Sequence, residues 1–98
     1  MTEIERLEKA IKDLHGAIGQ YAGSVAVHEK FEGQTVWQGV VEVFQIKGHP
    51  KAKTAYAWNY KTDNGDTHYV AVLELPPINS AQDAVRAYIV SHTAKKSS

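Results

Sequence analysis

The chain has no cysteine among its 98 residues, which excludes disulfide bridges, thiolate catalysis and zinc sites with cysteine ligands. It also has no excess charge, since 11 basic residues balance 11 acidic ones. Strong non-specific binding to nucleic acid depends on a cationic surface, so a nucleic-acid partner is not expected. A net charge of zero also gives one copy little electrostatic repulsion from another.

Long apolar segments are missing as well. No run approaches the roughly 20 residues that span a bilayer, and the charged start Met1–Arg6 does not fit a secretory signal. We therefore expect no membrane partner and a cytoplasmic location. An apolar fraction of 43% and a charged fraction of 22% are typical of a folded globular protein. A length of 98 residues predicts a single domain, residues 1–98.

Two segments have apolar residues at helical spacing, residues 3–16 and 80–93. Thr2 followed by Glu5 fits a capping box at the start of the first segment, and Ser80 is the expected N-cap of the second. The apolar positions are Ile4, Leu7, Ile11 and Leu14 in the first segment, with Ile18 continuing the spacing just beyond it, and Ala81, Ala84, Val85, Tyr88, Ile89 and His92 in the second.

Four segments between these helices read as strands, at about residues 24–32, 36–47, 53–61 and 67–75. Gly33 and Asn64-Gly65 mark tight turns, and Pro76-Pro77 ends the last strand. Short turns favour an antiparallel meander. The predicted fold class is α+β, in the order helix, four-stranded antiparallel meander, helix, with both helices on one face of the sheet.

Bulky side chains on both faces of the second and third strands suggest that two helices on one face leave apolar surface uncovered. We therefore expect self-association through the open sheet face. The aromatic side chains concerned are Trp37, Tyr56, Trp58 and Tyr60. Such rings can stack bases or sugars, but they can equally form core beneath the helices.

The best candidate for a ligand site is the loop of residues 48–53. Its side chains His49, Lys51 and Lys53 can gather positive potential for a small anionic ligand such as a phosphate or carboxylate. The alternative is that these charges only pair with the acidic strand that follows. We include Trp37, Tyr56 and Trp58 as candidate binding residues beside the loop.

Catalytic and metal motifs are weak. Five histidines lie about twenty residues apart, without the short His pairs of metal sites, so neither a metal nor a cofactor is expected. Glu42 lies among apolar neighbours, and burial there would raise its pKa and suit a general base. Exposure of Glu42, or its pairing with a lysine, is the alternative.

The sequence resembles known proteins in two respects. The order of elements resembles a double-stranded-RNA-binding domain, which implies RNA binding, although the second helix begins Ser80-Ala81-Gln82 where that family has a lysine cluster. The pattern Trp37-x-Gly39, Gly48-His49-Pro50, Tyr56-Ala57-Trp58 resembles short bacterial proteins of unknown function.

Together these observations predict a small non-enzymatic binding or protein-interaction module that self-associates as a homo-oligomer. An RNA-binding domain is one alternative, and a small enzyme using Glu42 or His49 is another.

Overall fold

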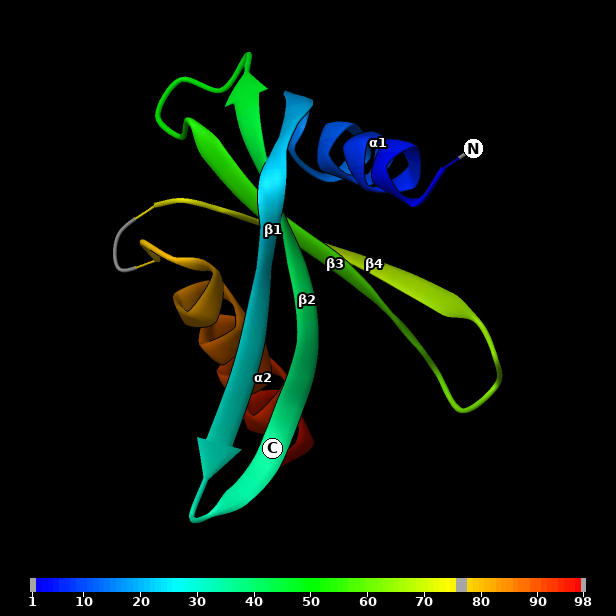
Figure 1. The fold of residues 1–98 in the computed structure, drawn as a ribbon, viewed down its shortest axis with the longest axis vertical. Coiled ribbons are helices and arrows are strands. Elements are labelled where there is room, and N and C mark those ends of the chain that lie inside the picture. Colours follow the sequence, from blue (N-terminus) through cyan, green and yellow to red (C-terminus); the bar gives the residue numbers. More distant parts are fainter. Residues whose placement is uncertain (1, 76–77, 98) are drawn as a thin grey trace.

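Two helices and one antiparallel sheet make up the described residues of this computed structural model, 2–75 and 78–97, with side chains described as far as Val90 (Figure 1). The elements are α1 (Glu3–His15), β1 (Ile18–Phe31), β2 (Gln34–Lys47), β3 (Thr54–Lys61), β4 (Thr67–Leu73) and α2 (Ala81–Ser97). The strand order is β1-β2-β3-β4, all antiparallel. The α+β class and the meander between two helices are therefore confirmed. The expected stop at Pro76-Pro77 and the side chain of His92 lie outside the described residues.

Helix α1 is capped at both ends. The Thr2 hydroxyl accepts a hydrogen bond from the Glu5 amide, and the Glu5 carboxylate accepts one from the Thr2 amide. At the other end Gly16 adopts a left-handed conformation with φ 68°, which glycine reaches without the steric cost of a side chain. The amide of Gly16 donates to the Lys12 carbonyl at 2.8 Å. The capping box of α1 is therefore confirmed.

Strand β1 begins at Ile18, earlier than the expected start near residue 24. Gly19 belongs to this strand, where a side chain would be too close to its neighbours. A Cβ atom at Gly19 would lie 3.1 Å from Ile11 Cδ1 and 3.4 Å from Phe44 Cδ2. Glycine at this position therefore lets the strand pass close beneath α1, and it does not mark a loop.

The other boundaries shift less. β2 starts at Gln34, and α2 continues to Ser97, beyond the expected residue 93. β4 ends at Leu73 and not at residue 75, because the Leu75 amide bonds back to the Leu73 carbonyl at 3.0 Å. That bond turns the chain away from the ladder.

The sheet is built from two hairpins that cross (Figure 1). β1 pairs along the full length of β2, from Ile18↔Lys47 to Phe31↔Gln34, whereas β2 pairs with β3 only from Glu42↔Ala57 to Gln45↔Thr54. Residues 34–41 of β2 therefore pair with β1 alone. We call residues 23–41, the part of the first hairpin beyond this crossing, the β1–β2 arm.

The two helices cover opposite faces of the sheet, so the expectation that both lie on one face is wrong. Consecutive residues of β3 show this directly. Ala55 and Ala57 belong to the core cluster of α1, with Leu7 and Ile11, whereas Tyr56 and Trp58 belong to the core cluster of α2. Because neighbouring side chains of a strand point to opposite faces, each helix must lie on its own side.

The aromatic side chains are consequently sheltered within one chain. Trp58 is 1% exposed, Tyr56 6% and Phe44 0%, whereas Trp37 and Tyr60 are half-buried. The expectation that these aromatic side chains form an open face is therefore wrong. Bulky groups on both faces of β2 and β3 do not require a second copy, because a helix covers each face.

One sheet surface nevertheless stays open. It is the face of the β1–β2 arm that points away from α2, opposite Val27 and Val41. Val40 on this face is 53% exposed. Ser24, Ala26, His28 and Gln38, which are also exposed on this face, are small or polar.

Candidate functional site

The loop of residues 48–53 between β2 and β3 is organised around His49. Its Nδ1 atom accepts hydrogen bonds from the amides of Lys51, at 3.1 Å, and Ala52, at 2.8 Å. Below it the Ile46 amide donates to the Lys53 carbonyl at 2.9 Å and closes the base of the loop. The imidazole therefore holds the loop backbone, and an Nδ1 atom that accepts two bonds leaves Nε2 as the protonated nitrogen in the neutral ring.

The same loop is seated on α1. Ala52 is 2% exposed and belongs to the core cluster of Leu7 and Ile11. Gly48 has φ 90°, and a Cβ there would come within 3.8 Å of the Gly16 carbonyl, so the loop lies beside the end of the helix. Burial of Ala52 and the close approach of Gly48 fix the loop against the fold.

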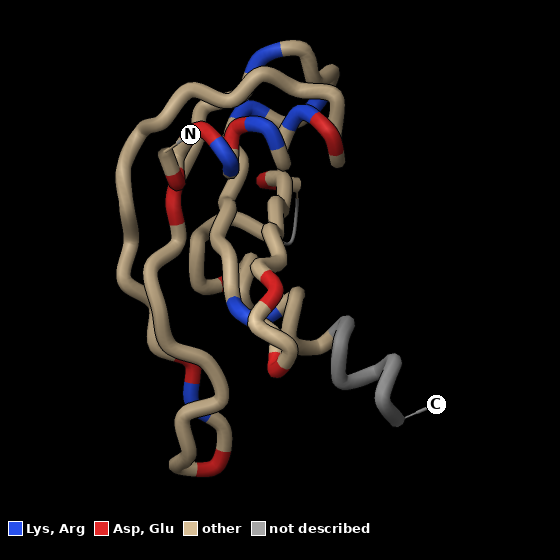
Figure 2. Tube along the Cα trace, turned by 90° about the vertical axis from the view of Figure 1, so that its right-hand side faces the viewer, with Lys and Arg blue, Asp and Glu red and all other residues tan. Residues whose placement is uncertain are grey.

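Lys51 and Lys53 of the loop are exposed, and so is Lys47, the last residue of β2. None of them forms an ion pair with any described residue. Lys12, in the last turn of α1, is exposed as well. In Figure 2 the basic positions of α1 and of this loop gather at one end of the molecule. His49, Lys51 and Lys53 therefore lie on one short loop at this end of the molecule.

The structure does not bring Trp37, Tyr56 and Trp58 to that loop. They belong to the core cluster of α2, on the other face of the sheet. The Tyr56 hydroxyl donates to Glu74 Oε2 at 3.1 Å, and burial, followed by this bond, raises the pKa of Tyr56 to about 12. Trp58 Nε1 is buried without a hydrogen-bond partner among the described residues. Tyr56 and Trp58 therefore act as core residues of the α2 side.

Trp37 and Trp58 begin a series of ring contacts that the sequence analysis missed. Their centroids lie 5.8 Å apart, and Trp58 meets Tyr88 of α2 edge to face at 5.6 Å. The Tyr88 hydroxyl donates to the Tyr60 hydroxyl at 2.8 Å, and His68 stacks on Tyr60 at 5.5 Å. Burial, then the bond to Tyr60, raises the pKa of Tyr88. These contacts form because α2 packs against β3, and the spacing of residues within either element does not predict that packing.

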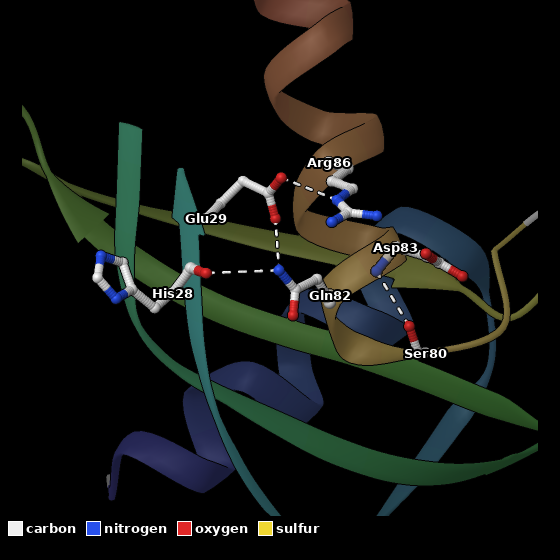
Figure 3. Close-up of polar contacts among 6 residues, drawn as sticks. All are labelled: His28, Glu29, Ser80, Gln82, Asp83 and Arg86. Carbon is white, nitrogen blue, oxygen red and sulfur yellow. Dashed lines mark hydrogen bonds and ion pairs between the residues drawn. The ribbon is translucent and has the colours of Figure 1, made fainter. Parts of the chain in front are cut away.

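A polar contact joins α2 to the edge strand β1 (Figure 3). Gln82 Nε2 donates to Glu29 Oε2 at 2.6 Å, and Arg86 Nε donates to Glu29 Oε1 at 2.8 Å. Gln82 also reaches the His28 carbonyl at 3.4 Å. The bond from Gln82, followed by that from Arg86, lowers the pKa of Glu29. Glu29 lies more than 50 positions from both Gln82 and Arg86, so no local pattern predicts the contact.

Glu42 is half-buried, and its Oε1 accepts a hydrogen bond from the Ser24 hydroxyl at 2.7 Å. The Ser24 oxygen in turn lies 2.6 Å from the Tyr21 hydroxyl. Glu42 therefore takes part in a hydroxyl chain at the base of the arm. Among the described residues, no group of three or more His, Cys, Asp or Glu side chains could hold a metal ion.

Comparisons with known proteins give no family: no family model, curated protein or solved structure matched the chain. The resemblances to a double-stranded-RNA-binding domain and to short bacterial proteins therefore stay predictions. In the part of the chain that the structure describes, neither helix has the length and apolar character needed to cross a bilayer.

Proposed function

We propose that the protein is a non-enzymatic interaction module that pairs with a second copy of itself through the outer edge of β1. A strand with one neighbour leaves a row of backbone N–H and C=O groups free to pair with another strand. β1 is such a strand and is 14 residues long. It therefore offers a long template for adding a strand from a partner.

The side chains of this edge do not repel a partner. Natural edge strands are commonly protected by charged residues, lysine above all, and by proline. From Ile18 to His28 the edge has neither, and β2 has no charged residue from Gln34 to Val41. Val25 is 42% exposed and adds apolar surface at the edge. This uncharged edge is the observation that carries the proposal.

The position of the charges on β1 favours an antiparallel pair of copies. Glu29 and Lys30 both lie near the end of the strand. Parallel, in-register pairing would place Glu29 opposite Glu29 and Lys30 opposite Lys30, which is destabilising. Antiparallel pairing centred between Gly23 and Val25 places both charges opposite the uncharged start of the other strand.

The contact with α2 shows which backbone groups are free. The His28 carbonyl points away from β2 toward Gln82 (Figure 3). The register of β1 on β2 is regular from Gly23 to Glu29. Because backbone groups alternate in direction along a strand, those of Ser24 and Ala26 face the same outer edge, where α2 does not reach.

Ala26→Pro tests the proposal by removing one outward N–H group. Proline is tolerated on an edge strand where the N–H faces solvent, so the protomer should keep its circular dichroism spectrum. Sedimentation velocity should show a dimer for the wild type and a monomer for the variant. Val40→Lys is the matched control, because it adds a charge on the paired residue of β2 and leaves the edge of β1 intact.

The outcomes separate an edge contact from a face contact. A dimer that survives in Ala26→Pro but dissociates in Val40→Lys would overturn the proposal in favour of packing between the open faces of two arms. A wild-type monomer at all concentrations would overturn both. A second measurement uses the wild type alone and so does not depend on whether a variant folds. Hydrogen exchange of the Ser24 and Ala26 amides should slow as the protein concentration rises.

A further inference from the structure

We propose that the β2–β3 loop, with His49 at its centre, is a binding site for a phosphate-type oxyanion. This site is independent of the proposed self-association. It lies at the end of the sheet where α1 ends, whereas the β1–β2 arm extends to the other end (Figure 1). The ligand class follows from the rigidity of the loop and from the groups that it displays.

The loop is already in place before a ligand arrives. Two bonds to His49 Nδ1, one bond across its base and the buried methyl of Ala52 each fix a different part of the backbone. A preorganised loop loses little conformational freedom on binding, so more of the interaction energy remains as affinity. A loop of free surface lysines lacks this property.

The groups displayed are donors and positive charges. His49 Nε2 has no hydrogen-bond partner among the described residues, and as the protonated nitrogen it can donate. The ammonium groups of Lys47, Lys51 and Lys53 have no carboxylate partner in the described part of the chain. The sequence from Lys47 to Lys61 contains no acid. An anion at the loop therefore meets no carboxylate from the loop itself or from β3.

Several donors around one short loop favour a compact, doubly charged ligand. A phosphate group offers three or more acceptor oxygens, so it can use an imidazole N–H and two ammonium groups at once. A long polyanion needs a continuous basic track. No such track leads from the loop along β3, because residues 54–60 contain no lysine or arginine. Inorganic phosphate or a phosphomonoester is the ligand that fits the loop.

Titration with inorganic phosphate, followed by amide NMR at constant ionic strength, tests the inference. Saturable shifts should appear at Gly48–Lys53, with chloride at equal ionic strength producing none. Lys51→Ala combined with Lys53→Ala should weaken phosphate binding at least tenfold. Lys61→Ala is the control, because it removes an equally exposed lysine from the end of β3 and should change the affinity less than twofold.

His49→Asn distinguishes ligand binding from loop structure. The asparagine carbonyl can replace Nδ1 as the acceptor of the loop amides, but no donor remains at the position of Nε2. We expect the loop amide shifts of the free protein to persist while phosphate affinity falls severalfold. Linear, unsaturated shifts that are the same in the double lysine variant would mean an adventitious ion only and would overturn the inference. Repeating the titration on Ala26→Pro keeps this result separate from self-association.

Discussion

The pKa of Tyr56 gives a quantitative test of where that ring lies. Its ordinary value of 10 is raised to about 12, first by burial and then by the bond to Glu74. The folded chain therefore holds the phenolic proton more tightly than the unfolded chain, so the free energy of unfolding must fall as the pH rises from 10 to 12. At pH 11 the expected loss is about 1.4 kcal/mol, approaching roughly 2.7 kcal/mol above pH 12.

Tyr56→Phe isolates this loss from the titration of other groups. At pH 8 the wild type should be more stable by about 1 kcal/mol, because the variant lacks one hydrogen bond. Above pH 10 that advantage should shrink, and near pH 11 it should reverse. Urea denaturation of both proteins between pH 8 and pH 12 measures the difference.

A control variant separates the two causes of the shift. Glu74→Gln removes the nearby charge but leaves the ring buried, so the pKa of Tyr56 should fall only part of the way towards 10. Absorbance at 295 nm follows the titration. If the stability difference between wild type and Tyr56→Phe did not vary with pH, Tyr56 would be solvent-exposed and the placement of α2 over it would be incorrect.

Two further substitutions test the helix contacts. Glu29→Gln should make the melting temperature less sensitive to acid. The lowered pKa of Glu29 stabilises the wild type at neutral pH, and that stabilisation disappears as the pH falls through the pKa of Glu29 in the folded state. Thermal melts of both proteins at pH 3 to 7 give the comparison. Ala57→Leu should overpack the interface with α1 and lower the free energy of unfolding, measured by urea denaturation, by about 1–3 kcal/mol. Tryptophan emission should stay unchanged, because Trp58 faces α2. A shifted emission maximum in the folded Ala57→Leu variant would place Ala57 and Trp58 on the same side.

Local signals predicted most of the secondary structure. Thr2 with Glu5 identified the start of α1, and Asn64-Gly65 identified the β3–β4 turn, because caps and turns depend on residues a few positions apart. The bounds of β1 were missed because Gly19 is required by a contact with Ile11 and Phe44, which lie in other elements. No periodicity along one strand carries that information.

The placement of the helices could not be predicted from amphipathicity. An apolar helix face and a two-sided strand agree equally well with helices on one face or on opposite faces of a sheet. Alanines at positions 55 and 57 leave room for α1, whereas Tyr56 and Trp58 fill the space beneath α2. For the candidate site, the loop lysines could be proposed from the sequence, but the two bonds to His49 Nδ1 needed coordinates.

Antiparallel pairing of β1 with a second copy is measured most directly by a distance between the two copies. Because the chain has no cysteine, Phe31→Cys provides a single attachment site for a spin label at a position that is 66% exposed. A strand rises roughly 3.3 Å per residue. If the pair is centred between Gly23 and Val25, the two labels are therefore about 40–53 Å apart. Pulsed electron paramagnetic resonance should show this distance. Labels closer than about 20 Å would contradict the account. So would the absence of a dipolar signal at a concentration where sedimentation shows a dimer.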